Sequence, residues 1–145
     1  MRYADVVLMA AEAYNETGTD RQKAWDLLNS VRTRAEATSI TEANYDEMMS
    51  VRKKTHNLTF IDDSTPEGKF RTALYWERGF ELAFEGQRWF DLVRLDKVEE
   101  VMNAVYAKDS GRKAQVYAFD KNSYRLPIPQ SVIDANDKIQ QNPGY

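Results

Sequence analysis

The chain has 145 residues, the size of one domain, and its 42% hydrophobic and 12% aromatic content is enough to bury a core, which excludes a disordered tail. Its 20 basic and 23 acidic side chains give a formal net charge of −3, which argues against a nucleic-acid partner held through phosphate contacts. The absence of cysteine and the single histidine, His56, exclude disulfides, thiolate metal sites and histidine-cluster metal sites. We therefore expect no metal and no cofactor.

Residues 1–37 predict a helical hairpin. Apolar side chains recur from Tyr3 to Tyr14 at the spacing of one helix face, and Gly18 is placed to end that helix. Thr19 and Gln22 form the capping-box pattern of a second helix. Two helices of this length around a glycine turn have the size of one tetratricopeptide-like unit. The buried stripe of the second helix is expected to be Ala24, Leu27, Leu28, Val31 and Ala35.

The first predicted helix is apolar nearly all round, because Val6, Leu8 and Met9 lie outside its main apolar face. A helix of this kind needs neighbours on two sides. No second copy of the hairpin is visible in the chain, and such units are rarely stable alone. We therefore expect the missing neighbours upstream and interpret the chain as a fragment of a larger protein.

The middle of the chain predicts further helices. Residues 41–54 favour a short helix, followed by a β-prone stretch over residues 57–61 that we expect as loop or edge. A strong helix start follows at Thr65-Pro66-Glu67, because it joins a capping hydroxyl, a proline at the first helical position and an acid at the positive end of the helix dipole.

The helix that starts there is expected to run to about Gly86. Because a glycine inside a helix is costly, we expect a close backbone contact at Gly79. Its expected apolar face is Ala73, Trp76, Phe80, Ala83 and Phe84. After a break, residues 87–95 continue as helix, and a weaker helix over residues 98–106 is closed by Ser110-Gly111.

The C-terminal part is of another kind. Residues 124–129 contain two prolines that favour extended backbone in the residues before them, so this segment is not helical. Residues 131–136 predict one or two helical turns, and residues 141–145 a polar, turn-rich tail. Together the elements predict a mostly α fold with extended connections.

The densest group of charged residues offers the main candidate for chemistry. Three of its acids, Glu77, Glu81 and Glu85, are four residues apart and therefore line one side of a helix. Two such carboxylates are the catalytic groups of glycoside hydrolases, but nothing in the sequence raises the pKa of one of them selectively. We therefore favour a charge network that holds helices together. The cations available to it are Arg78, Arg88 and Arg94, with Arg32 and Arg34 from the hairpin, and Asp91 lies among them.

The aromatic residues are the candidates for stacking on sugar rings. Trp76, Phe80 and Phe84 have core spacing, and a packed role is also favoured for Trp25 and Trp89. His56, in a polar loop, is expected to be solvated. Tyrosines in or near loops are freer to contact a partner, namely Tyr106, Tyr117, Tyr124 and Tyr145.

Several stretches together point to a family. RYADVVLMAAEAYNETG, AWDLLNSVRTRA and ERGFELAFEGQRWFDLVRL, followed by LPIPQSVIDAN and QNPGY, resemble in order and spacing the C-terminal part of SusD/RagB-family outer-membrane nutrient-binding proteins. The most specific pieces are ELAFEGQRWFDL, residues 81–92, and the LPIP…QNPGY ending. The resemblance leaves out about residues 38–65 and 96–119.

The resemblance implies a non-enzymatic surface lipoprotein of the outer membrane. Such proteins bind glycans, or in some branches peptides, and deliver them to a TonB-dependent transporter of the SusC type. Their fold is an α-helical scaffold with tetratricopeptide-like helix pairs. Family members are several times longer and carry a lipid-bearing cysteine that this chain lacks, so the anchor is expected to be absent from it and the fragment to be soluble.

The resemblance also implies that the family's glycan contacts lie mainly upstream, so no carbohydrate-binding residue and no catalytic residue is assigned here. Contributions from Tyr45, His56 or Phe60, in the unmatched stretch, are unsupported.

We expect one SusD/RagB-like C-terminal domain over residues 1–145. Its parts are the hairpin (1–37), a variable insert (38–65), the helices with the ELAFEGQRWFDL motif (66–107) and a loop-rich tail (108–145). The expected function is glycan binding and delivery, with this chain mainly as scaffold. Two alternatives come from other classes: a helical adaptor that binds a protein partner, and a glycoside hydrolase that uses two of Glu77, Glu81 and Glu85.

Overall fold

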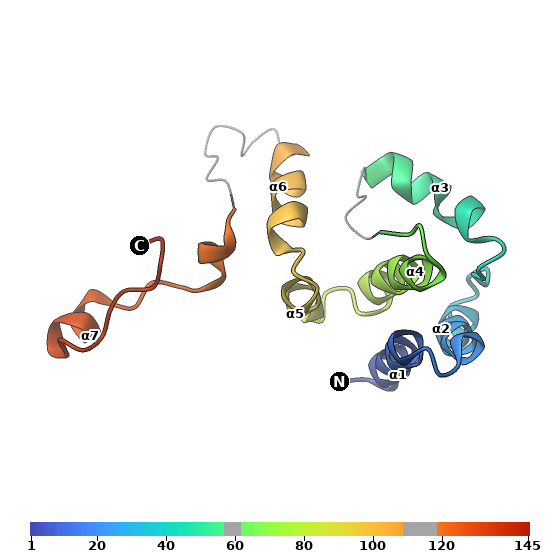
Figure 1. Ribbon diagram of the computed structural model, residues 1–145, viewed down its shortest axis with the longest axis horizontal. Helices are drawn as coiled ribbons and strands as arrows, with labels where there is room; N and C mark the ends of the chain where they lie inside the picture. Colours follow the sequence, from blue (N-terminus) through green and yellow to red (C-terminus); the bar gives the residue numbers. More distant parts are fainter. Residues whose placement is uncertain (57–61, 109–118) are drawn as a thin grey trace. The chain divides into compact units, whose positions relative to one another are not determined.

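The computed structural model describes residues 1–56, 62–108 and 119–145 (Figure 1), with the side chains of residues 51, 53–56, 108 and 123 outside the description. No strand occurs among these residues, and the mostly α fold predicted from the sequence is confirmed. The chain forms two compact units, Met1–Arg94 and Leu95–Tyr145, described separately below. The helices are α1 (Tyr3–Thr17), α2 (Arg21–Arg34), α3 (Tyr45–His56), α4 (Pro66–Glu81), α5 (Gln87–Arg94), α6 (Val98–Lys108) and α7 (Gln130–Ala135), with a 3-10 turn η2 (Lys121–Tyr124).

The predicted hairpin is present, with α1 packed on both α2 and α4. Gly18 ends α1 as expected: its φ of 66° lies in the left-handed region, where glycine carries no steric penalty. The predicted capping box is wrong by one residue, because the carboxylate of Asp20 accepts from the Lys23 N–H at 2.8 Å. The Thr19 hydroxyl pairs instead with Thr17, and the side chain of Gln22 donates to Asp26. Whether the hairpin is tetratricopeptide-like stays a prediction.

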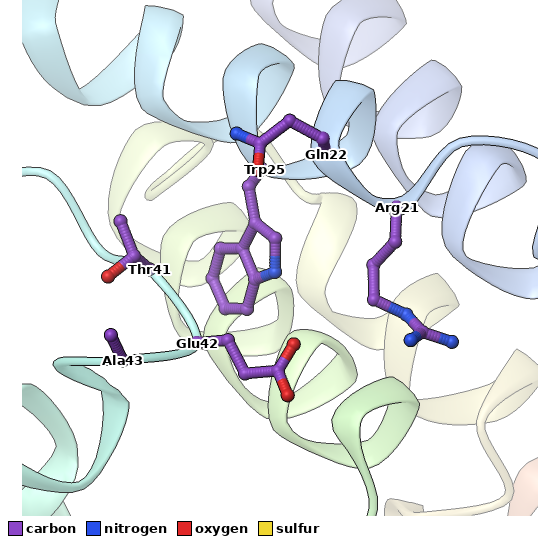
Figure 2. Close-up of a pocket in the computed structure, with 6 residues that line it drawn as sticks. All are labelled: Arg21, Gln22, Trp25, Thr41, Glu42 and Ala43. Atoms are coloured by element: carbon purple, nitrogen blue, oxygen red, sulfur yellow. The ribbon is translucent and has the colours of Figure 1, made fainter.

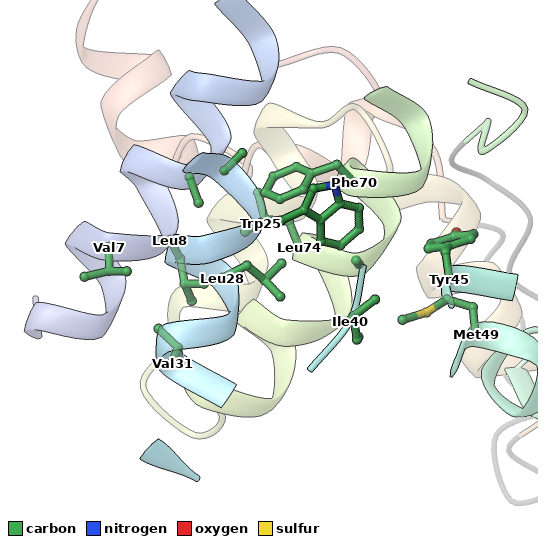
Figure 3. Close-up of a cluster of buried hydrophobic side chains, with 13 residues drawn as sticks. Val7, Leu8, Trp25, Leu28, Val31, Ile40, Tyr45, Met49, Phe70 and Leu74 are labelled. Carbon is green, nitrogen blue, oxygen red and sulfur yellow. The ribbon is translucent and has the colours of Figure 1, made fainter. Parts of the chain in front are cut away.

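The hydrophobic core of the first unit lies between α1, α2, the segment leading to α3, the start of α3 and the first half of α4 (Figure 3). Trp25 and Phe70 meet edge to face, with ring centroids 4.9 Å apart, and both are buried. The stripe predicted on α2 is buried at Ala24, Leu28 and Val31, whereas Ala35 is exposed because α2 has ended before it.

The apolar circumference of α1 is only partly covered within this unit. Leu8 is fully buried although it lay outside the predicted face, because α1 turns that side towards its neighbours. Tyr3, Val6 and Met9 are exposed. One side of α1 therefore carries exposed apolar side chains within this unit.

Helix α4 begins as predicted but ends early. The Thr65 hydroxyl accepts from the Gly68 N–H at 3.1 Å, and Pro66 occupies the first helical position. The helix stops at Glu81 because a tight turn follows, in which Phe84 and Gly86 have φ values of 64° and 74°.

The close contact predicted at Gly79 is made by a side chain, not by backbone. A Cβ on Gly79 would lie 3.4 Å from the guanidinium of Arg88. That guanidinium lies 3.6 Å from the centre of the Tyr75 ring and donates to the Tyr75 carbonyl at 3.0 Å. Burial there lowers the pKa of Arg88.

The second unit contains α6, η2, the extended segment and α7. The amide of Gln141 donates to the Ile128 carbonyl at 2.9 Å and accepts from the Ile128 N–H at 2.8 Å, while Asn142 donates to the Leu126 carbonyl at 2.7 Å. The polar tail therefore replaces the backbone hydrogen bonds that a helix would have supplied to the proline-rich segment. The extended segment is confirmed for residues 125–129, whereas Tyr124 ends the 3-10 turn η2 and was wrongly included in it. The short helix near residues 131–136 is confirmed. The expectations for residues 57–61 and for Ser110-Gly111 lie outside the described residues.

The misplaced cap gives a stability prediction. We expect Asp20→Ala to lower the free energy of unfolding by about 1 kcal/mol, because it leaves the Lys23 N–H without its acceptor. The matched control is Thr19→Ala, which leaves that acceptor in place and should change stability little. Urea unfolding of the three proteins measures both effects, and a loss at Thr19→Ala equal to that at Asp20→Ala would contradict the assignment.

Candidate functional site

The charged residues singled out in the sequence meet at the second half of α4. Glu77 is buried there and forms an ion pair with Arg32 of α2, whose side chain is equally buried. The Nε of Arg32 also donates to the Thr38 carbonyl at 2.8 Å. Arg32 is buried although it is not among the residues predicted for the buried stripe of α2, because its guanidinium neutralises the buried Glu77.

The next two acids of the stripe are held by two arginines from the hairpin. Glu81 accepts from Arg34 at 2.7 Å and from Arg2 at 2.8 Å, and Arg2 also binds the backbone carbonyl of Glu81. The same Arg2 donates to both oxygens of Glu85, at 2.8 and 3.0 Å. These hydrogen bonds lower the pKa of Glu85. Arg2 therefore joins the chain before α1 to the end of α4.

A second group lies around Arg78, which is buried between two helices. Its guanidinium donates to Asp5 of α1 at 2.9 Å and to Asp91 of α5 at 2.9 Å, and both carboxylates are buried. Arg94 binds Asp91 at 3.3 Å and Glu12 at 2.9 Å. The two groups together are named the arginine network: Arg2, Asp5, Glu12, Arg32, Arg34, Glu77, Arg78, Glu81, Glu85, Asp91 and Arg94.

The arginine network has the chemistry of a charge network that holds helices together. Each of the three stripe acids is bound to an arginine, as the charge pattern predicted. A glycosidase needs one carboxylic acid with a raised pKa, whereas hydrogen bonds from Arg2 shift the pKa of Glu85 in the opposite direction.

The predicted burial of the aromatic residues is confirmed for some and wrong for others. Trp25 is buried and Trp76 partly so, but Phe80 and Phe84 are exposed, so their core assignment is wrong. The reason for Phe84 is that α4 ends at Glu81 and leaves it in the turn. The ring of Phe80 stacks on that of Trp76, with centroids 6.0 Å apart, and the guanidinium of Arg52 lies 4.9 Å from the Phe80 ring centre. Trp89 is 37% exposed.

The remaining candidates are scattered. Tyr45 is fully buried and donates to Asp63 at 2.7 Å, which removes it from ligand contact, and its burial raises the pKa of its hydroxyl. Tyr145 is exposed and Tyr106 is half-buried. Tyr117, Phe60 and the side chain of His56 lie outside the described residues. No group of three acidic or histidine side chains in the described ranges could hold a metal ion.

In the first unit a pocket opens at the start of α2 (Figure 2). It has a volume of about 450 Å³ and is lined by Arg21, Gln22 and Trp25 of α2 and by Thr41, Glu42 and Ala43 of the following segment. Trp25 is only 4% exposed, and its indole N–H has no hydrogen-bond partner among the described residues. The Nε of Arg21 is likewise buried and unpaired within those residues, although its Nη2 binds Glu67. Sequence reasoning missed this pocket, because its two walls are far apart along the chain.

The second unit has a smaller pocket of about 310 Å³ between η2 and the tail. Lys121, Asn122, Tyr124, Arg125 and Pro143 line it. Gly144 beside it has a φ of 96°, and a Cβ there would lie 2.9 Å from the Cβ of Asn122. The glycine of the tail is therefore required by space as well as by backbone conformation.

Comparison with known proteins agrees with the resemblance seen in the sequence. The whole chain, residues 1–145, matches the sequence model of the SusD family. It is 34% identical over 147 residues to the SusD-like protein P2 of Formosa agariphila, covering 100% of this chain and 25% of that protein. The SusD-like proteins P38 and P25 of the same organism are 33% and 32% identical, over 99% of this chain and 24% of each relative. The chain thus spans about a quarter of the length of these relatives.

The graded burial of the ion pairs along the stripe gives a testable order of stability. We expect Glu77→Gln to lower the free energy of unfolding by about 3–5 kcal/mol, because Arg32 would be left buried and unpaired. Glu81→Gln should cost less, since Arg34 and Arg2 are partly exposed, and Glu85→Gln least. Thermal melts of the three variants test the order, and an unchanged melting temperature for Glu77→Gln would contradict the network's structural role.

The hydrogen bonds from arginine also predict acid sensitivity. The pKa of Glu16 is lowered chiefly by its hydrogen bonds from Arg71, and that of Glu85 by those from Arg2. A carboxyl whose pKa is lower in the folded than in the unfolded state stabilises the fold above its unfolded pKa of about 4.3, and this contribution is lost as the pH falls through the folded value. We expect the melting temperature to be level above about pH 5 and to decline below about pH 4.

The control for this pH profile is Glu16→Gln, which removes one of the depressed carboxyls. Its melting temperature should be lower than the parent's near pH 7, and the difference should shrink in acid. A difference that stays constant down to pH 3 would show that the hydrogen bonds from Arg71 do not depress the pKa of Glu16.

Proposed function

Because the chain belongs to the SusD family, we propose that it is part of a protein that binds glycans at the surface of the outer membrane and delivers them to a TonB-dependent transporter of the SusC type. The observation that carries this proposal is the family match over residues 1–145. Within that protein the chain acts mainly as scaffold. Its action is binding, not catalysis.

The arginine network supports the scaffold role. Its ion pairs connect four parts of the chain, which are the residues before α1, helix α2, helix α4 and helix α5. The pairs formed by Arg32 with Glu77 and by Arg78 are buried. A surface that captures a glycan works best when it is largely preformed, because ordering flexible groups on binding costs affinity. Helices held in this way provide a rigid base for such a surface.

The proposed location is the cell surface, with the protein attached through a lipid anchor. No helix in the described ranges is long and apolar enough to cross a membrane. The anchor, the transporter and the glycan are parts of the proposal that come with the family.

An adaptor function is the second candidate, favoured by one observation. Exposed apolar side chains occur on α1, at Tyr3, Val6 and Met9, and on α5, at Phe90 and Val93. Faces of this kind are typical of surfaces that pack against other protein. In the proposed function they contact the rest of the glycan-binding protein or the transporter, whereas an adaptor would use them for an unrelated protein.

Affinity electrophoresis separates these functions. The chain is run through native gels that contain a panel of polysaccharides, beside the full-length SusD-like protein P2, with a gel lacking polysaccharide as control. We expect at least one polysaccharide to retard P2 strongly and this chain much less, because the chain supplies mainly scaffold.

Two other outcomes would contradict the proposal. If neither protein is retarded in any gel, glycan binding fails and the adaptor function gains. If the chain and P2 are retarded equally, glycan binding stands but the chain carries the main contacts, and the scaffold assignment is wrong.

A further inference from the structure

Two arginines of the first unit differ from the others in their partners. Nine arginines lie in Met1–Arg94, and seven of them form an ion pair with a carboxylate. Arg52 and Arg88 have no carboxylate within ion-pair distance among the described residues, and each lies over an aromatic ring instead. Arg88 is used inside the fold, because it donates to the Tyr75 carbonyl at 3.0 Å and is attracted by Asp91. Arg52 has neither kind of contact within the described part of the chain.

The charges around Arg52 leave its own charge uncompensated. The acid that attracts it is Glu77, which already forms a buried ion pair with Arg32. Burial and repulsion by Arg32 lower the pKa of Arg52. A guanidinium nevertheless stays protonated in proteins, so two arginines and one glutamate leave one net positive charge here. An additional anion beside Arg52 would therefore be attracted.

The guanidinium of Arg52 can be reached from solvent. Its Nη1 makes a long contact of 3.6 Å with the sulfur of Met49, and its Nε and Nη2 have no hydrogen-bond partner within the described residues. None of its nitrogens is both buried and unpaired. A carboxylate or sulfate at the surface can therefore accept charge-assisted hydrogen bonds from this side chain.

An exposed aromatic ring adjoins this cation. Helix α3 packs on α4 (Figure 1) and brings the guanidinium of Arg52 to 4.9 Å from the ring centre of Phe80, which is 54% exposed. The Phe80 ring is held in turn by stacking on the partly buried Trp76, at an interplanar angle of 22°. We name Arg52, Trp76 and Phe80 the Phe80 surface. It places a cation next to apolar area that solvent reaches.

This pairing selects among ligand chemistries. A neutral sugar offers no charge to Arg52, and an inorganic anion would leave the Phe80 ring unused. An acidic sugar carries both groups in one unit, because its carboxylate or sulfate suits a guanidinium and the C–H groups of its ring suit an aromatic side chain. The formal net charge of −3 gives an acidic glycan no long-range attraction to the chain, so its binding depends on this local cation.

We propose that the Phe80 surface binds an acidic sugar unit of a glycan, with the carboxylate or sulfate on Arg52 and the sugar ring against Phe80. The inference rests on the proposed function and names a ligand class for it. A single unit on an open surface binds weakly, on the order of millimolar. The chain therefore remains mainly a scaffold and contributes one contact to a longer glycan.

Nuclear magnetic resonance of the Trp76 indole N–H observes this surface. The chain has three tryptophans, and the indole signal missing from Trp76→Phe is that of Trp76. The acidic probes are methyl α-galacturonoside and galactose 6-sulfate, and the matched neutral probe is the methyl ester of the same galacturonoside. We expect at least one acidic sugar to shift the Trp76 signal in a saturable way. The ester should bind at least about tenfold more weakly, because it carries no charge for Arg52.

Variants separate the charge from the ring. Arg52→Gln should weaken binding of the acidic sugar at least about tenfold, whereas Arg125→Gln, which removes an exposed cation of the second unit, should leave it unchanged. Phe80→Leu should weaken binding about threefold, because the guanidinium and the sugar lose the ring. Phe90→Leu, at another exposed phenylalanine, is its control. Far-UV circular dichroism establishes that each variant is folded.

The outcomes separate this inference from the proposed function. A response to the ester as strong as that to the acidic sugars, or binding unchanged in Arg52→Gln, overturns the acidic-sugar site and leaves glycan binding intact. The α-amide of N-acetylglutamate carries a single carboxylate on a peptide unit. If it binds as tightly as the acidic sugars, the surface recognises a carboxylate alone, and the sugar is replaced by an acidic protein as its partner.

Absence of binding also has a definite meaning. If no probe shifts the Trp76 signal while a polysaccharide retards P2, the inference fails and the proposed function stands. If no polysaccharide retards P2 either, both fail.

Discussion

The fold of the first unit depends on one buried cation. Arg78 lies in α4 and binds Asp5 of α1 and Asp91 of α5, and all three side chains are at most 8% exposed. Removing a guanidinium from water is costly, and only well-formed hydrogen bonds to carboxylates offset that cost. The three helices must therefore keep the positions in which both acids reach Arg78. Buried charge is weak evidence for high stability, but it strongly restricts how the helices pack.

The other ion pairs extend this restriction to the rest of the unit. Glu77 and Arg32 join α4 to α2, and Arg2 holds both acids that flank the turn after α4. That turn requires left-handed backbone at Phe84 and Gly86, which is unfavourable for phenylalanine. Arg2 donates a hydrogen bond to the carbonyl of Glu81 at the end of the helix. It thereby satisfies an acceptor at the point where helical hydrogen bonding stops. Ionic contacts thus stabilise a backbone change that local sequence preference opposes.

The sequence predicts the helices well and their buried faces less well. Helix starts and stops follow from local chemistry, which is why Thr65, Pro66 and Gly18 were correctly assigned. Burial depends on partners distant in the chain. Arg32 is inside only because Glu77 is there, and Phe84 is outside because the turn begins before it. The pocket at Trp25 was not predictable, since an unpaired indole N–H is defined by what the rest of the chain leaves unfilled.

The arginine network and the pocket at the start of α2 differ in how far their polar groups are paired. In the network, arginines and acids hydrogen bond to one another, and little of their capacity is left for a ligand. In the pocket, Arg21 binds Glu67 through its Nη2, and its Nε is unpaired among the described residues. The indole N–H of Trp25 is also unpaired among those residues. The packing of α2 on Phe70 and on α1 positions Arg21 and Trp25, and the charges of the arginine network do not. Changes that loosen the network and changes that fill the pocket should therefore act separately, because the two regions share α2 but no side chain.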